Sequence, residues 1–261
     1  MTVDVLIGAY NCEDFIIQCL DSVNEQSIKP AKIIIIDDFS SDTTLFKIKN
    51  YMCNSSIPIK IVTNNKNLGL TKSLNLGLKL CSSELVARLD ADDLWHKRKL
   101  EFQIKFLKKN PNIHFCCSNI TFTGEINTEK YSNPFLKTSD FPFTNPFNHS
   151  SLLIYKNVLN SLNNYNEFYK YSQDTDLYFR LMKNGFKGEI LIDKLVIRRI
   201  SKKIIGLKKR RQQLFFFLTV QIRYFFSHLK LNRYHLFLSI IKTSFRILIP
   251  QKLINIIKYV F

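Results

Sequence analysis

The sequence predicts an α/β protein with a doubly wound, mostly parallel sheet, and three observations lead to this fold class. Apolar runs of strand length alternate with segments whose apolar residues recur at helical spacing. One run, residues 31–38, is almost continuously apolar, as expected of a parallel strand covered by helices on both faces. Polar residues follow three of these runs directly, where open α/β sheets bind ligands. With 261 residues, 46% of them hydrophobic, the chain can bury one large core.

The first ninety residues follow this alternation closely. Their apolar runs are rich in β-branched residues, including four consecutive isoleucines at Ile33–Ile36. We expect strands at residues 3–10, 31–38, 59–64 and 83–90, and helices at 12–27 and 70–81. Units of this βαβ kind connect parallel strands and predict an open sheet.

The remainder of the sheet region contains fewer clear signals. Residues 95–111 are expected to form a helix ended by Pro111, residues 113–122 a strand, and residues 175–185 a helix closed by Gly185. Residues 124–150 contain prolines among Asn, Ser and Thr. We therefore expect a loop over the sheet edge that could form a lid.

Several function classes are disfavoured by what the sequence contains. The six cysteines form no CxxC pair and no Cys/His cluster with zinc spacing, so reduced thiols in a cytosolic protein are expected. The N-terminal MTVDVLIGAYN is expected to be a strand and not a signal peptide. The chain has neither a GxxxxGK[ST] nor a GxGxxG motif, which argues against an ATPase or a dinucleotide enzyme.

An acidic cluster, Asp90, Asp92 and Asp93, follows the fourth predicted strand. If Asp90 to Asp92 stays extended, two carboxylates point the same way, and their repulsion is relieved by a cation between them. Mg²⁺ or Mn²⁺ commonly binds one or two carboxylates together with water and substrate phosphates. The cluster therefore predicts a site for a metal diphosphate. The alternative is a solvated acidic turn that caps a helix at Trp95.

The first two predicted strands end in the same kind of signal. Gly8–Asn11 follows the first strand and Asp37–Asp42 follows the second. Ligands bind at such ends because loops and helix N-termini converge there. Asp38 and Ser40 could also be only a turn and an N-cap for the next helix.

Six stretches together resemble the family 2 glycosyltransferases, inverting enzymes of the GT-A type that use nucleotide-sugar donors. The resemblance covers roughly residues 3–200, in the order and spacing of the family. The stretches are VLIGAYNCEDFIIQCLDSVNEQS, KIIIIDDFSSD, NLGLTKSLNLGL, ELVARLDADDLWHKRKLEFQ, NHSSLLIYKNVL and QDTDLYFRLMKNG.

The resemblance implies a role for each of several residues in the donor site. Tyr10, with Asn11 beside it, would lie against uracil or another base, and Asp38 would accept a hydrogen bond from the ring N–H. The Asp90-Ala91-Asp92 segment matches the DxD motif of the family. Asp90 would face the ribose or sugar, Asp92 would hold Mn²⁺ or Mg²⁺ on the diphosphate, and Asp93 would be a supporting acid. Further candidate donors to the nucleotide or phosphates, for which a plain surface role is equally open, are Asn67, Lys72 and Arg88.

The catalytic base is implied by the stretch QDTD. Asp174 matches the basic Asp of the family's acidic pair, whereas Gln173 replaces the acid that precedes it. This departure leaves Asp176 as an alternative, although Asp176 could also be an acid that favours the first turn of a helix.

Other residues fall near the acceptor side. His149 is expected there, with a structural histidine as the alternative. The family often carries a further His that assists the diphosphate. It is missing here. Either Arg198, Arg199 or Lys202 would neutralise the phosphate charge instead, or the site would be more open.

The C-terminal region carries nearly all of the excess positive charge. The formal net charge is +17, and from Lys194 onward there are 16 Lys and Arg and no acid, which leaves 22 basic and 21 acidic residues before it. Aromatic clusters with polar residues at helical spacing predict amphipathic helices broken at Pro250. The longest uncharged stretch there, Gln212–Ile222, has eleven residues, too few to span a bilayer. Attachment to an anionic membrane surface is expected, with packing on the core or on a second copy as the alternative.

Together, these inferences predict the domain organisation, the reaction and the location of the protein. A GT-A catalytic domain at residues 1–205 would be followed by a basic helical extension at 206–261. The chain would transfer sugar from a nucleotide donor, first of all a UDP-sugar, to a lipid-linked or polysaccharide acceptor. It would invert the anomeric centre and serve surface polysaccharide or lipopolysaccharide synthesis at the cytoplasmic face of the membrane. Nucleic acid is not an expected partner, since no RNA-binding motif accompanies the charge.

Two other function classes are compatible with the fold. One is a non-catalytic scaffold that binds a membrane or a partner transferase through its basic tail. The other is a nucleotidyltransferase, against which the lack of a glycine-rich N-terminal phosphate loop counts. The sequence does not indicate the sugar, the acceptor, the linkage or the oligomeric state.

Overall fold

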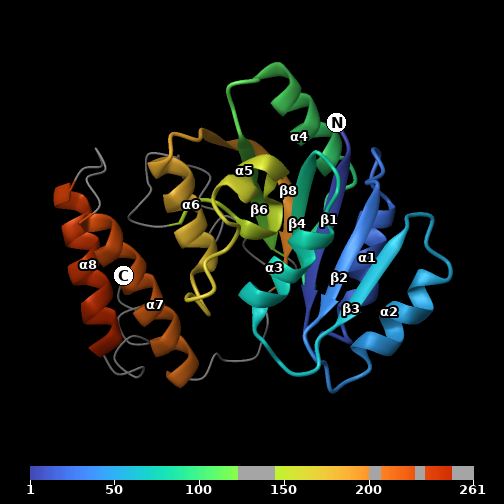
Figure 1. The fold of residues 1–261 in the computed structure, drawn as a ribbon, viewed down its shortest axis with the longest axis horizontal. Coiled ribbons are helices and arrows are strands. Elements are labelled where there is room, and N and C mark those ends of the chain that lie inside the picture. The colour runs from blue at the N-terminus through green and yellow to red at the C-terminus, as the bar shows by residue number, and fades with distance from the viewer. Residues whose placement is uncertain (123–144, 200–206, 227–232, 249–261) are drawn as a thin grey trace.

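The computed structural model describes residues 1–122, 145–199, 207–226 and 233–248. Within these residues the centre is an eight-stranded sheet in the order β3-β2-β1-β4-β7-β6-β8-β5 (Figure 1). Its strands are β1 (Val3–Ala9), β2 (Lys32–Asp37), β3 (Ile59–Thr63), β4 (Leu85–Asp90), β5 (Leu94–Trp95), β6 (Phe115–Phe122), β7 (Leu153–Tyr155) and β8 (Gly188–Arg198).

The sheet has a parallel half and a mixed half. Strands β3, β2, β1 and β4 are all parallel, with Gly8 beside Ile36 on one side and beside Asp90 on the other. Strand β7 is antiparallel to both β4 and β6, whereas β6 and β8 are parallel. The predicted doubly wound, mostly parallel sheet is confirmed, and its first four strands lie close to their expected positions.

Helices cover both faces of the sheet. They are α1 (Ile16–Asn24), α2 (Thr44–Met52), α3 (Leu70–Leu80), α4 (Lys99–Lys109), α5 (Lys156–Ser161), α6 (Gln173–Lys183), α7 (Leu207–Phe225) and α8 (Arg233–Leu248). Val5 and Ile7 belong to a core shared with α1, α2 and α4, whereas Leu6 belongs to a second core shared with α3, α5, α6 and α7. The isoleucines of β2 alternate in the same way, which explains why this strand is apolar throughout.

The helix predicted from Trp95 begins later than expected. Leu94 and Trp95 form β5, which pairs with Ile197 and Val196 of β8, and α4 starts only at Lys99. The prediction for this boundary is wrong because an edge pairing with a strand about a hundred residues away takes the place of the first helical turn. Helix α4 does end just before Pro111, and Gly185 follows α6 with a φ of 77°, as expected.

The two C-terminal helices are present and pack against the body of the protein. Helix α7 contacts both α6 and α8 at the end of the molecule away from β1–β3 (Figure 1). Tyr224 of α7 stacks on Phe179 of α6 with ring centroids 4.2 Å apart. Among the helices of the described residues, none has both the length and the apolar character needed to cross a membrane.

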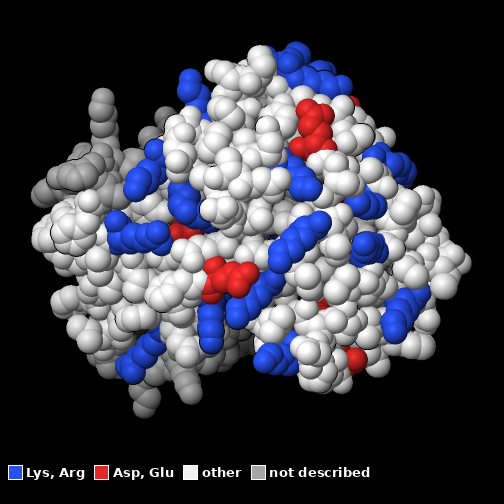
Figure 2. All heavy atoms as spheres, in the orientation of Figure 1, with Lys and Arg blue, Asp and Glu red and all other residues white. Residues whose placement is uncertain are grey.

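Parts of three predictions fall outside the described residues. They are most of the loop expected at 124–150, Lys202, and the helix break at Pro250. Figure 2 adds that Lys and Arg are spread across the face it shows, with Asp and Glu at only a few places.

Candidate active site

A cavity of about 1160 Å³ opens at the carboxyl ends of β1, β2 and β4. We call the side built on these ends the strand wall; its lining includes Gly8–Tyr10, Asp38, Asn67–Leu70 and Asp90. A second part of the lining, which we call the helical wall, comes from α6, α7, α8 and the residues before α6; it includes Lys170–Thr175, Gln213, Phe217 and Arg246. The cavity thus lies where open α/β sheets bind ligands.

Asp38 holds the loop that enters α3. One carboxylate oxygen accepts hydrogen bonds from Asn64 Nδ2 at 2.7 Å and Leu68 N at 2.8 Å, and the other accepts one from Gly69 N at 2.8 Å. A carboxylate has about four acceptor positions, so one remains for a further donor. Gly69 has a φ of 84°, a conformation that favours glycine. Asp38 therefore shapes the strand wall as well as lining it.

Tyr10 and Asn11 behave differently although they are neighbours. Tyr10 lines the cavity with about half of its surface exposed. The side-chain oxygen of Asn11 accepts a hydrogen bond from Ser41 N at 2.8 Å, and its backbone N–H donates to Ser40 Oγ. Asn11 is not among the lining residues, so it fastens the loop after β1 to the loop after β2.

The acidic segment after β4 is a turn. Asp93 N donates to Asp90 O at 3.0 Å, so the segment turns after Asp90 and does not continue as an extended strand. Asp90 lines the cavity, Asp92 is exposed, and Asp93 is buried. Of the three acids, only Asp90 therefore lines the cavity.

Arg88 positions Asp90. Its side chain is 2% exposed, and NH2 lies 2.6 Å from Asp90 Oδ1. Burial alone would raise the pKa of Asp90, but the positive charges of Arg88 and Arg198 hold it below its ordinary value. Arg88 itself does not line the cavity, so it supports the site from behind Asp90.

The pKa values of the two neighbouring acids are shifted upward instead. Partial loss of solvent around its carboxyl group raises the pKa of Asp92, although the residue is exposed, and the negative charge of Asp90 raises it further. Burial and the charges of Asp90 and Asp92 raise the pKa of Asp93 to about 7. Asp93 also accepts a hydrogen bond from Arg199 N at 3.3 Å. Because the negative charge of Asp90 raises the proton affinity of both neighbouring acids, a cation beside them would be favourable.

Asp90 and Asp92 are better suited to a cation that also binds substrate oxygens than to one held by protein ligands alone. In the described part of the chain there is no group of three or more His, Cys, Asp or Glu placed to enclose a metal. Mg²⁺ and Mn²⁺ are usually held by one or two carboxylates plus water and phosphate oxygens. Asp92, exposed next to Asp90, provides such a partial ligand set.

Asp174 faces the cavity from the first turn of α6. Its carboxylate accepts a hydrogen bond from Asn145 Nδ2 at 2.8 Å. Burial raises the pKa of Asp174, and backbone N–H groups of the first helical turn partly oppose that rise. A carboxyl group with a raised pKa is a better proton acceptor than an ordinary aspartate.

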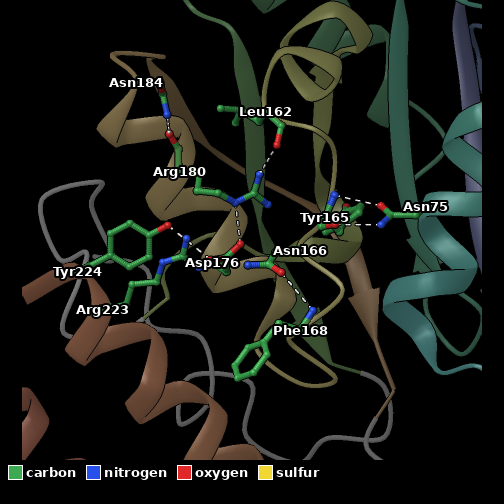
Figure 3. Close-up of polar contacts among 10 residues, drawn as sticks. All are labelled: Asn75, Leu162, Tyr165, Asn166, Phe168, Asp176, Arg180, Asn184, Arg223 and Tyr224. Carbon is green, nitrogen blue, oxygen red and sulfur yellow. Dashed lines mark hydrogen bonds and ion pairs between the residues drawn. The ribbon is translucent and has the colours of Figure 1, made fainter. Parts of the chain in front are cut away.

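Asp176 points away from the cavity and connects helices. Figure 3 shows it between Arg180 of its own helix and Arg223 and Tyr224 of α7. Its carboxylate lies 2.7 Å from Arg180 Nε and 3.9 Å from Arg223 NH1, and its side chain is fully buried. These contacts give Asp176 a structural use that Asp174 lacks.

The other predicted residues are dispersed. His149 lines the cavity, bonds Tyr165 Oη at 2.7 Å through Nε2, and has its pKa lowered to about 3 by burial and by Arg88. Asn67 and Arg198 line the cavity, whereas the exposed Lys72 does not. Arg199 instead contacts Gln18 and the ring of Phe15.

Sequence reasoning did not single out several residues that the fold brings to the site. Asn145 lies in a stretch expected to be loop, and its contact with Asp174 spans 29 positions. Ser150 Oγ accepts the backbone N–H of Asp90 at 3.0 Å, and Ser150 O accepts the indole N–H of Trp95 at 3.0 Å. No local pattern indicates such pairs. In the sequence, Arg246 is only one of the 16 Lys and Arg residues from Lys194 onward.

Comparisons with known proteins identify the family and the fold of this chain. The family model described as "Glycosyl transferase family 2" matches residues 4–169. The amylovoran biosynthesis glycosyltransferase AmsE of Erwinia amylovora is 30% identical, over 79% of each chain. A UDP-Gal:alpha-D-GlcNAc-diphosphoundecaprenol beta-1,3-galactosyltransferase of Escherichia coli is 28% identical, over 92% of this chain and 91% of its own. Among solved structures, the mannosyltransferase PcManGT of Pyrobaculum calidifontis, in complex with GDP-Man and Mn²⁺, has a TM-score of 0.68 at 16% identity. It covers 85% of this chain and 63% of its own.

Proposed function

The chain belongs to glycosyl transferase family 2, and from that membership we propose that it transfers a sugar from a UDP-sugar to a lipid-linked acceptor. The reaction would invert the anomeric carbon and serve the synthesis of a cell-surface polysaccharide. The similarity to a galactosyltransferase named for a UDP-Gal donor and a diphosphoundecaprenol acceptor supports both substrate classes. The GT-A fold is common to this chain and its structural neighbours.

The observation that carries the proposal is that Asp90, from the end of β4, and Asp174, from the first turn of α6, line the same cavity. A transferase that inverts in one step must hold the leaving group on one side of the sugar and the attacking hydroxyl on the other. The strand wall would hold the nucleotide, and the helical wall would hold the acceptor. An arrangement of this kind suits in-line displacement.

The donor would be bound by the strand wall. Tyr10 would stack on the base, and the free acceptor position of Asp38 would receive the ring N–H of the base. Asp90, fixed by Arg88, would contact the ribose or sugar, and Asn67 would donate to the nucleotide. For Asn11, Lys72, Arg88 and Asp93 we propose supporting roles, in loop geometry or in the local charge, and not direct contact with the donor.

A divalent cation, Mn²⁺ or Mg²⁺, would be held by Asp92 and, when bound, would neutralise negative charge on the diphosphate leaving group. This proposal is supported by the exposure of Asp92 beside a second carboxylate. The Mn²⁺ in the complex of the mannosyltransferase PcManGT supports it at the level of the fold.

Asp174 would take the proton of the acceptor hydroxyl as the oxygen attacks the anomeric carbon. The bond to the diphosphate breaks as the new glycosidic bond forms, and the proton ends on the Asp174 carboxylate. Asn145 orients that carboxylate through its hydrogen bond. His149 is uncharged at neutral pH and bonded to Tyr165, so it would contribute shape and hydrogen bonding, not proton transfer.

The C-terminal helices would attach the enzyme to the cytoplasmic face of the membrane. We propose residues 1–205 as the catalytic domain and 206–261 as the extension that carries this attachment. Large apolar side chains are exposed along α8, among them Phe237, Ile241, Phe245 and Leu248. A helix with such a stripe beside cations lies well in the headgroup region of an anionic leaflet.

The direct test is release of UDP from a panel of UDP-sugars, with and without a polyprenyl-diphosphate-linked sugar as acceptor. We expect release that depends on acceptor and on Mn²⁺ or Mg²⁺, and its loss when EDTA is added. If no donor is bound and none is consumed under any condition, the chain is a scaffold of this fold and the proposal fails.

A further inference from the structure

Helix α3 carries two buried polar side chains that the chemistry of transfer does not use. The loop before this helix is held by Asp38, which accepts the backbone N–H groups of Leu68 and Gly69. Further along the helix, Thr71 and Asn75 are only 3% and 9% exposed, and neither lines the cavity. Buried polar groups need hydrogen-bond partners, and both side chains find them in one distant loop.

That loop, residues 162–172, joins α5 to α6. Thr71 Oγ1 donates to Tyr169 O at 2.6 Å. Asn75 Oδ1 accepts the N–H of Tyr165 at 3.0 Å, and Asn75 Nδ2 donates to Tyr165 O at 2.9 Å (Figure 3). Side chains four positions apart lie on the same face of a helix. One face of α3 therefore fastens the backbone of the loop at two points, through three hydrogen bonds.

The fastened loop leads directly to the candidate base. Residues 170–172 line the cavity immediately after Tyr169, and Asp174 follows in the first turn of α6. Ser172, which precedes the helix, has a φ of 59°, in the left-handed region that non-glycine residues seldom adopt. Such a conformation persists only where the surrounding structure holds it. A shift of the backbone at Tyr169 would therefore be passed on to the carboxylate of Asp174.

The same loop also fixes a second residue of the cavity. Tyr165, held at its backbone by Asn75, bonds His149 Nε2 through its hydroxyl at 2.7 Å, and His149 lines the cavity. Residues on the side expected to receive the acceptor thus depend on contacts with α3, whose entry loop is held by Asp38. In-line displacement is sensitive to such placement, since an error of about 1 Å can cost about 10²-fold in rate.

We propose that Thr71 and Asn75 are positioning residues, which hold the loop before α6 against α3 and so set the place of Asp174 relative to a nucleotide bound at Asp38. This inference rests on the proposed function and adds to it the element that joins the donor side to the base. Neither side chain touches substrate. Their loss should therefore slow transfer and leave the affinity for UDP unchanged.

The first test compares threonine variants of matched shape. Thr71→Val removes the hydroxyl and keeps the branching, so kcat should fall about tenfold while the Kd for UDP stays at the wild-type value. Thr71→Ser keeps the hydroxyl and should retain most of the turnover. The control is Thr44→Val, since Thr44 is also a buried threonine in the first turn of a helix, and its hydroxyl accepts the N–H of Cys12 at 2.8 Å. This variant should keep the wild-type kcat even where its thermal stability falls as much.

A double variant separates positioning from general damage. If Thr71 acts through Asp174, Thr71→Val should lower kcat no further once Asp174→Asn is present. The proposal is overturned if the two losses multiply in full, if Thr71→Val has the wild-type kcat, or if Thr44→Val loses as much turnover as Thr71→Val.

A measurement without turnover distinguishes this inference from the proposed function. Hydrogen–deuterium exchange of the full chain reports directly on the backbone amides. In Thr71→Val, peptides that cover residues 165–176 should exchange about tenfold faster, whereas those that cover 64–69 should be unchanged, because Asp38 still holds them. Thr44→Val should change neither set. Unchanged exchange at 165–176 would overturn the inference even in an active enzyme. A wild type that shows the expected exchange but consumes no donor would contradict the proposed function alone.

Discussion

The strand wall and the helical wall of the cavity are held in place by different kinds of contact. On the strand wall, backbone groups set the geometry: Asp38 accepts two backbone N–H groups, and Asp90 ends a strand paired along its length with β1. On the helical wall, side chains set it. Asp174 is fixed by Asn145, and α6 is joined to α7 through Asp176.

Because of this difference, the two walls should differ in how well they tolerate substitution. A wall built from strand ends and backbone hydrogen bonds presents one geometry, which suits a nucleotide with fixed chemistry. A wall built from side chains on helices can change by substitution without disturbing the sheet. The comparison predicts that single substitutions on the helical wall separate chemistry from stability.

The largest expected effect is on catalysis. Asp174→Asn should lower kcat by about 10²- to 10⁴-fold, because the amide cannot take the proton of the acceptor. Thermal unfolding and the Kd for UDP should stay at the values of the wild type, since the donor is expected on the other wall. Wild-type turnover in the folded variant would show that Asp174 is not the base.

The next effect is on stability. Asp176→Asn should lower the free energy of unfolding by about 3 kcal/mol, because it leaves the half-buried Arg180 without its charged partner. Urea denaturation followed by circular dichroism measures this. Asp174→Asn is the matched control, two positions away on the same helix, and should unfold as the wild type does. Equal stability of both variants would mean that Asp176 does not hold the helices together.

A smaller effect concerns pH. Asn145 stabilises the charged form of Asp174, so Asn145→Ala should raise the pKa of that carboxyl further. Activity needs the ionised base and falls as pH drops through this pKa, so the acid limb of kcat/KM should move upward by about one pH unit. Asn184→Ala, which removes a side chain at the other end of α6, should leave the profile unchanged. An unmoved acid limb in Asn145→Ala would contradict the assignment of that limb to Asp174.

The smallest effect is expected at the exposed side of the contact between α6 and α7. Arg223 is 55% exposed, and its NH1 lies 3.9 Å from Asp176. Such pairs contribute less than about 1 kcal/mol, so Arg223→Gln should change the urea midpoint little. A loss as large as that of Asp176→Asn would show that Arg223, and not Arg180, is the main partner of Asp176.

The sequence predicted the parallel half of the sheet well because each of its strands has a continuous local signal. Ile33–Ile36 are apolar on both faces, and this pattern needs no knowledge of the rest of the chain. The mixed half was predicted less completely. Strand β7 has only three residues, and β8 carries Glu189, Asp193 and Lys194 among its apolar positions. Both depend on partners far away in the sequence.

The candidate site divides in the same way. Asp38, Asp90 and Asp174 could be identified because they follow strands or begin a helix in a family motif. Asn145, Ser150 and Arg246 could not, because each is defined by a contact or a wall that forms only in the folded chain. The turn at Asp90–Asp93 was missed for a related reason: one backbone hydrogen bond, from Asp93 to Asp90, decides it.

Trp95 lies in an unusual position for a packing residue. It is the only tryptophan in the chain, and its indole N–H is bonded to Ser150, whose hydroxyl holds the backbone of Asp90. The ammonium group of Lys99 lies 3.9 Å from the centre of its ring. All of the tryptophan fluorescence of this protein therefore originates a few residues from the acidic turn. Loading of that turn can thus be followed by its intrinsic emission, without attaching a dye.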